Sequence, residues 1–90
     1  MDNSKIYLEI AHKFSFKNMN YLRNDSICGC FYCLEIFTPK EIKEVIEESD
    51  GKETALCPYC GIDAVVGKSS CFPITKQLLS EMNRRYFGSN

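Results

Sequence analysis

The sequence has no tryptophan, a single histidine and no long hydrophobic run. A membrane helix needs about 20 apolar residues, and the uncharged stretches here are much shorter and carry polar side chains. No apolar stretch of the secretory type follows the first five residues, so we expect no signal peptide. Low-complexity tracts and internal repeats are absent as well. These absences predict a cytoplasmic protein of one globular domain, with no membrane contact.

Clustered charge of one sign is also lacking. Residues 1–27 carry four basic and three acidic side chains. Residues 28–56 carry three basic and seven acidic side chains, and residues 57–90 carry four basic and two acidic ones. The net charge of the whole chain is −1. Nucleic-acid-binding domains usually show a dense Lys/Arg patch, so this distribution disfavours nucleic-acid binding without excluding it. No glycine-rich phosphate loop and no pair of catalytic carboxylates is present in the sequence.

Cysteine, in contrast, is abundant, with six in 90 residues. A domain of this size has a thin stability margin, so a bound metal or disulfides would matter to its folding. A reducing cytosol disfavours disulfides. The cysteines therefore indicate metal or redox chemistry.

Four of the six cysteines form two C-x-x-C turns, separated by 23 residues. Each turn brings two sulfurs toward one ion, and two turns complete a tetrahedral shell with no open position. CPYCG has a stiffening Pro58 and a trailing Gly61, whereas CFYCL lacks the glycine. We predict a structural four-cysteine site, with Zn²⁺ favoured over iron, which suits the same donors and would indicate electron transfer. The predicted metal ligands are Cys30, Cys33, Cys57 and Cys60; the alternative is four buried thiols.

The two other cysteines are harder to interpret. Cys28, in CGCFYC, could replace Cys30, lie beside the metal, or simply pack, and packing is favoured. Cys71 is expected to be a buried thiol in a loop, with a fifth ligand or a reactive thiol as alternatives. A disulfide between them requires close approach and is disfavoured in the cytosol.

A few further residues are candidates for chemistry. His12 is expected at the edge of a helix and exposed or hydrogen-bonded; an enzyme would need it beside Cys28, Cys71 or Asp63. Asp63 is expected to bond the backbone of the second turn. Arg84 and Arg85 could touch an anionic partner, but complementing a helix dipole is favoured.

Apolar spacing predicts helices near both ends of the chain. The first covers residues 4–14, with Ser4 as N-cap, and a short one covers residues 18–23 with Tyr21 and Leu22 inward. The last covers residues 75–87, begins at Thr75 and stops at Gly88. The stripe expected on the first helix consists of Ile6, Tyr7, Ile10, Ala11 and Phe14; the core face expected on the last consists of Leu78, Leu79, Met82 and Tyr86.

A third long helix is predicted over residues 38–48. Thr38 and Glu41 match a capping box, Pro39 suits the first turn, and Gly51 can end the helix with positive φ. Its expected apolar stripe is Ile42, Val45 and Ile46. Short strands are expected at residues 55–56 and 62–66, with a turn at 67–70.

The sequence from Cys28 to Phe87 resembles a group of small bacterial zinc-ribbon-like proteins usually labelled only "cytoplasmic protein". The similarity covers most of the chain, although Cys71 stands where a glycine would be expected, which makes Cys71 look peripheral. It implies metal binding and a cytoplasmic location, and no activity. The residues that carry it are Ala11-His12, Ser15, CGCFYC, Phe37-Thr38-Pro39, Glu41-Ile42, CPYCGIDAVVG, Pro73-Ile74-Thr75 and Tyr86-Phe87.

Together these patterns predict an α+β fold: a zinc-ribbon or rubredoxin-like knuckle pair, a short antiparallel sheet and about three helices. One domain, residues 1–90, would comprise a helical segment 1–27, knuckles with an intervening helix 28–71, and a C-terminal helix 72–90.

The first expectation for function is a non-enzymatic module that binds an unidentified protein through its helices. An exposed patch among Tyr7, Tyr21, Tyr32 and Tyr59 would support it. The alternatives are a nucleic-acid-associated zinc protein and an enzyme using His12 or a spare cysteine. Nucleic-acid binding requires one face that gathers Lys13, Lys17, Arg23, Arg84 and Arg85. The oligomeric state is not predicted.

Overall fold

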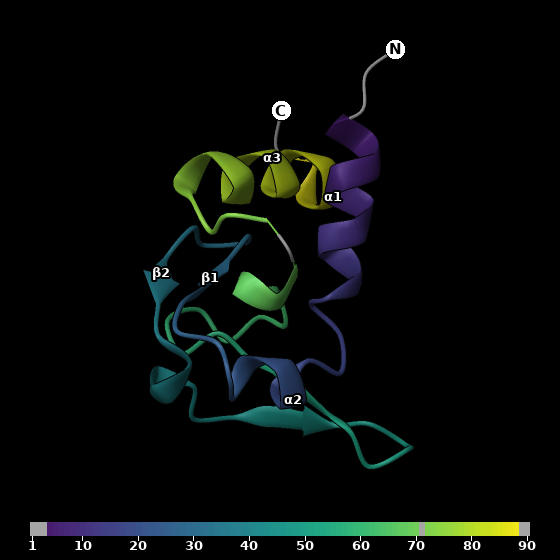
Figure 1. The fold of residues 1–90 in the computed structure, drawn as a ribbon, viewed down its shortest axis with the longest axis vertical. Coiled ribbons are helices and arrows are strands. Elements are labelled where there is room, and N and C mark those ends of the chain that lie inside the picture. The colour runs from purple at the N-terminus through teal and green to yellow at the C-terminus, as the bar shows by residue number, and fades with distance from the viewer. Residues whose placement is uncertain (1–3, 71, 89–90) are drawn as a thin grey trace.

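The computed structural model describes residues 4–70 and 72–88 and has an α+β fold (Figure 1). Its three described α-helices are α1 (Ser4–Lys13), α2 (Met19–Leu22) and α3 (Lys76–Phe87), and two 3-10 turns cover Pro39–Glu41 and Lys68–Ser70. Helices α1 and α3 lie side by side at one end of the molecule, and α2 lies at the other. The expected α+β class with about three helices is confirmed at this level, although the helix expected over residues 38–48 is not among the three.

A three-stranded antiparallel sheet forms the centre of the fold, in the order β2-β1-β5. Its strands are β1 (Cys28–Cys30), β2 (Ile36–Phe37) and β5 (Val65–Gly67). Cys28 pairs with Phe37 on one side and with Gly67 on the other. The sequence did not predict β1, because a CGC stretch has none of the alternating apolar pattern of a strand. Strand β5 begins three residues later than expected.

The predicted helix over residues 38–48 is wrong. The capping box of Thr38 and Glu41 does form, but the helix stops after one 3-10 turn, and Ile42 is already extended with φ −69° and ψ 124°. The chain then forms β3 (Val45–Glu47), which pairs antiparallel with β4 (Glu53–Ala55).

Two effects explain the hairpin. Strand β4 is largely buried, so its backbone needs a pairing partner, and β-branched side chains favour a strand over a helix. Gly51 has the expected positive φ of 84°, but it belongs to the turn between β3 and β4 rather than to a helix end. The capping box of Thr38 and Glu41 is a local signal, and it determined only one helical turn.

Helix α1 forms close to the predicted bounds but buries a different face. Leu8 and Ala11 face the core, whereas Ile6, Tyr7 and Ile10 are 53%, 52% and 38% exposed. The expected inward stripe of this helix therefore lies largely on the surface. Tyr21 of α2 is also exposed, contrary to the prediction, while Leu22 is buried as predicted.

Helix α3 agrees with the prediction and covers the central sheet. The Thr75 hydroxyl accepts a hydrogen bond from the Leu78 amide, and Gly88 ends the helix in the left-handed conformation. Leu79 and Met82 are fully buried. A Cβ at Gly29 would lie 2.8 Å from Cδ1 of Leu79, so a glycine in β1 is what allows α3 to pack this closely.

Asn18, at the start of α2, connects three parts of the fold. Its buried amide donates to the carbonyl oxygens of Phe14 at 2.9 Å and Val65 at 2.7 Å, and accepts from the Ala55 amide at 3.0 Å. The end of α1, strand β5 and strand β4 therefore meet on one side chain.

We predict that Asn18→Ala lowers the free energy of unfolding by about 2–3 kcal/mol, because it leaves buried backbone groups without partners. The matched control is Asn24→Ala, whose amide makes one exposed hydrogen bond of 3.4 Å to Asn20. The control should change stability by less than about 0.5 kcal/mol. Equal effects of both substitutions in urea unfolding would contradict the role given to Asn18.

Candidate metal centre

The four cysteines of the two C-x-x-C turns meet at one point. The sulfurs of Cys30, Cys33, Cys57 and Cys60 all lie within 4.8 Å of one another. The Sγ atoms of Cys30 and Cys60 are 3.6 Å apart, and those of Cys33 and Cys57 are 3.7 Å apart. A disulfide would bring sulfurs to about 2.05 Å. With metal–sulfur bonds of about 2.3 Å, a tetrahedral site places its sulfurs about 3.8 Å apart, so this group can hold a metal ion.

The first turn is positioned by the hairpin of β1 and β2. The Cys30 amide donates to the Glu35 carbonyl at 2.9 Å, and the Leu34 amide donates to the Cys30 carbonyl at 2.8 Å. The amides of Tyr32 and Cys33 point at the Cys30 sulfur, at 3.3 and 3.5 Å. Such N–H groups stabilise a thiolate.

The second turn repeats this geometry. The Cys57 amide donates to the Ile62 carbonyl, and the Gly61 amide donates to the Cys57 carbonyl, both at 2.9 Å. The Tyr59 amide lies 3.3 Å from the Cys57 sulfur. Two turns with the same hydrogen-bond pattern thus supply two sulfurs each.

The residue after each turn has a left-handed backbone. Gly61 has a φ of 81°, and Leu34 has a φ of 69° at the equivalent position. Glycine adopts this conformation without strain, whereas leucine does so at a cost of about 1–2 kcal/mol. The strained Leu34 shows that the first turn requires the same left-handed backbone conformation as the second. The first turn lacks the trailing glycine that marks the second turn in the sequence.

Contacts outside the turns hold the two halves together. The Phe31 amide donates to the Ala64 carbonyl at 2.9 Å, which joins the first turn to the segment after the second. From α3, the Asn83 amide donates to the carbonyl oxygens of Phe31 and Tyr32, both at 3.1 Å. The Tyr59 hydroxyl donates to Glu41, the residue of the capping box. Sequence reasoning missed Asn83 and this role of Glu41, because both act across the fold.

The pKa values of the thiols are those of a site that needs a cation to hold its sulfurs as thiolates. Burial raises the pKa of the Cys30 and Cys33 thiols, and backbone N–H groups offset this only in part. For Cys57, burial acts in the same direction, but the amides of Tyr59 and Cys60 and the neighbouring thiols outweigh it and lower the pKa. Four thiolates in one place repel one another, so a metal ion would displace protons and compensate the charge.

Cys28 lies outside the group of four. It is fully buried in β1, with its Sγ 3.5 Å from the Phe37 carbonyl oxygen, and burial raises its pKa to about 12. It shares a strand face with Cys30 but lies two residues before it, at a distance of about 6.6 Å along the strand. In this structure Cys28 is therefore a packed thiol. Cys71 lies outside the described residues.

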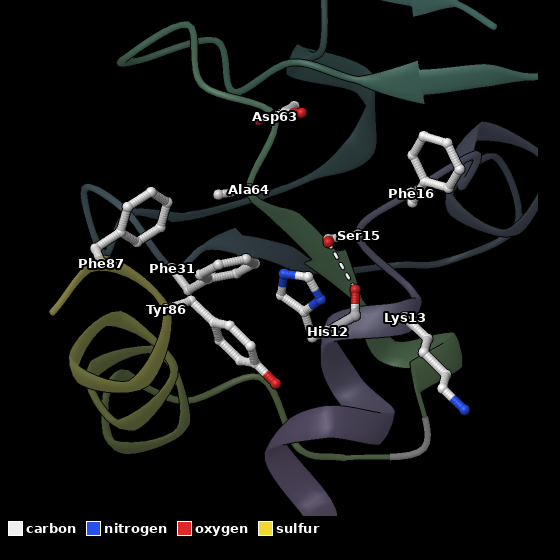
Figure 2. Close-up of a pocket in the computed structure, with 9 residues that line it drawn as sticks. All are labelled: His12, Lys13, Ser15, Phe16, Phe31, Asp63, Ala64, Tyr86 and Phe87. Carbon is white, nitrogen blue, oxygen red and sulfur yellow. Dashed lines mark hydrogen bonds between the residues drawn. The ribbon is translucent and has the colours of Figure 1, made fainter.

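His12 and Asp63 line one pocket, shown in Figure 2. The His12 ring stacks on Tyr86 with centroids 4.0 Å apart. Within the described ranges, the His12 ring makes no hydrogen bond to Cys28 or Asp63, and Asp63 makes none to the second turn. Of the three partners that an enzyme using His12 could have, Cys28 and Asp63 are thus not hydrogen-bonded to it, and Cys71 lies outside the described residues.

The basic residues named in the sequence are spread over two ends of the molecule. Lys17 pairs with Asp50 at 2.8 Å and Arg23 with Glu53 at 2.7 Å, both near the β3–β4 hairpin. Arg85, on α3, pairs with Glu9 of α1 at 2.7 Å. Carboxylates thus engage three of the five cations, so the arrangement gives no support to a nucleic-acid-binding face.

We predict that Gly61→Ala weakens metal binding about tenfold, because a positive φ strains alanine by about 1–2 kcal/mol within the second turn. The control is Gly51→Ala. Gly51 has a φ of 84°, and an added Cβ at Gly51 or at Gly61 would meet no atom within 4 Å. Gly51 lies in the hairpin turn, so this variant should lose similar stability and keep its metal affinity. Competition with a chromophoric chelator measures the affinity, and equal losses in both variants would contradict the prediction.

Comparison with models of protein families, with curated proteins and with solved structures gave no match. No helix in residues 4–70 and 72–88 combines the length and apolar character that crossing a bilayer requires.

Proposed function

We propose that this chain is a non-enzymatic zinc-binding protein whose metal is structural. The observation that carries the proposal is the convergence of four sulfurs, within 4.8 Å of one another, from two turns of the same geometry. Four thiolates fill a tetrahedral shell and leave no position for water or substrate, so we assign the metal no catalytic role.

A structural role suits a domain of this size. Ninety residues build a small core, and a metal that binds only the folded chain contributes its binding energy to folding. Iron fits the same four sulfurs, and zinc is the default for a ribbon in a mixed helical domain. The proposed metal chemistry suits a cytoplasmic location, because none of the five described cysteines forms a disulfide. The resemblance to small bacterial zinc-ribbon-like proteins implies the same assignment.

We predict one zinc per chain in the wild-type protein and in Cys28→Ser, and loss of zinc in Cys30→Ser and Cys57→Ser. Cys28 serves as the matched control, because it is as buried as Cys30 and lies two residues away on the same strand. The measurement is elemental analysis of untagged protein, together with thermal unfolding before and after a chelator. Chelation should lower the melting temperature of the wild type strongly.

Two results would overturn this assignment. If the purified protein is coloured and contains stoichiometric iron, the site is a redox centre and not a structural zinc site. Metal retained in Cys30→Ser but lost in Cys28→Ser would mean that the sulfur group is incorrectly identified.

We further propose that the protein acts as an interaction module through the outer face of α1. Ile10 lies four residues after Ile6 and three after Tyr7, so it neighbours both on the helix surface, and all three side chains are exposed. Amphipathic helices bind partner proteins through such a face. The other exposed tyrosines lie on separate elements, with Tyr32 packed on Phe87 and Tyr59 bonded to Glu41.

Charged substitutions test this face. We predict that the double variant Ile6→Asp, Ile10→Asp no longer captures a partner when the tagged protein is incubated with an extract of its native cells. The zinc content of this variant should be unchanged. Ile46→Asp, which alters an exposed apolar residue of the hairpin, is the control and should leave capture intact. Capture that persists in the α1 variant would contradict the assignment of this face.

A further inference from the structure

The β3–β4 hairpin has one open edge. Strand β3 pairs with β4, and in the described part of the chain no further strand pairs with β3, whose three residues are all exposed. The outer edge of β4 is covered, because the Asn18 side chain accepts a hydrogen bond from the Ala55 amide at 3.0 Å. The hairpin lies at the end of the molecule opposite α1 and α3 (Figure 1). An open edge of this kind can take up another strand.

The register of the hairpin determines which backbone groups of β3 face outward. The Glu44 carbonyl accepts a hydrogen bond across the hairpin at 3.1 Å, and the Glu48 amide donates one at 2.8 Å. In an antiparallel pair, residues bonded in this way alternate with residues whose N–H and C=O point away from the partner strand. The backbone groups of Val45 and Glu47 therefore face outward, and they are available to a further strand.

One antiparallel pairing of this edge with itself makes its charges complementary. It places Val45 opposite its own copy on a two-fold axis, so that Lys43 lies opposite Glu47 of the second copy. Each opposed pair of outward-facing residues exchanges two hydrogen bonds, and opposite charges across strands stabilise the pairing. Lys43 follows Ile42, whose backbone is already extended. Lys43 and Glu47 are both exposed, and neither forms an ion pair with any described residue.

The glutamates of this edge disfavour the other registers. A pairing that brings outward-facing groups together can slide only in steps of two residues. The next register in one direction places Glu44 opposite its own copy, and the next in the other direction places it opposite Glu48. Like charges directly opposite each other are destabilising. With Val45 on the axis, Glu44 instead lies opposite Ile46 of the second copy. The charges thus select a single self-complementary register.

We propose that the edge of β3 pairs two copies of this chain into a symmetric dimer, whose hairpins form one antiparallel sheet in the order β4-β3-β3-β4. The same surface serves on both copies, as a two-fold axis requires. Strands this short bury far less than the roughly 1,200 Å² of a stable complex, so the dimer is weak and depends on concentration. This self-association goes beyond the proposed interaction module and leaves both α1 faces uncovered.

The test is sedimentation equilibrium of the full chain, as purified with its metal, over about a hundredfold range of concentration up to about 1 mM. Lys43→Glu and Glu47→Lys should each weaken the dimer at least tenfold, because each brings like charges together. An equal mixture of the two variants should regain the wild-type affinity. In the mixed dimer the introduced glutamate lies opposite the introduced lysine, and the unchanged Lys43 lies opposite the unchanged Glu47.

Lys40→Glu is the matched control, since it changes the net charge equally at an exposed residue outside β3. It should leave the dimer unchanged. Amide hydrogen exchange gives a second readout that does not depend on any substitution. Exchange at Val45 and Glu47 should slow as the concentration rises, whereas the Glu48 amide is already bonded within the hairpin.

Three results would overturn the proposal. The first is a wild-type chain that stays monomeric over the whole range, and the second is a mixture of the two charge variants that does not dimerise. The third is a dimer lost in the Ile6→Asp, Ile10→Asp double variant but kept in Lys43→Glu, which would move the interface to α1. A monomeric chain that binds an added basic peptide at Val45 would replace the second copy by a strand of another protein. Zinc content and partner capture at low concentration are measured separately, so failure here leaves those proposals standing.

Discussion

The centre of this fold brings four cysteine sulfurs from two distant turns into one small volume. Backbone amides stabilise the sulfurs of Cys30 and Cys57, and the hydrogen bond from Phe31 to Ala64 holds the two turns in register. The central sheet serves the same end, because β1 delivers Cys30 and pairs with β5, which follows the second turn. Helix α3 then covers this arrangement and binds the first turn through Asn83.

Two local signals of the sequence predicted the structure correctly. The spacing of the cysteines indicated the group of four sulfurs, and the caps at Thr75 and Gly88 indicated α3, because both depend on neighbouring residues. The capping box at Thr38 also formed. Its helix did not, since β4 competes for residues 45–47, and that competition is invisible without the tertiary fold.

Features that join distant segments could not be predicted. Helical spacing in α1 places apolar residues on two faces, and only the packing against α3 decides that Leu8 and Ala11 are buried. The left-handed Leu34 carries no sequence signal, because leucine is not typical of that conformation. The pocket around His12 and Asp63 draws on four segments. Both residues could be named from the sequence, but not the rings that surround them.

The β3–β4 hairpin has a consequence for how such a chain can diversify. It occupies the stretch between the two C-x-x-C turns, its outer strand is exposed throughout, and a Cβ added to Gly51 at its tip would meet no atom within 4 Å. Lengthening a loop whose ends are already fixed costs little entropy, roughly 0.6 kcal/mol for each doubling. The tip is thus a natural insertion point, where peptide sequences of varied length can be displayed on an unchanged four-cysteine scaffold.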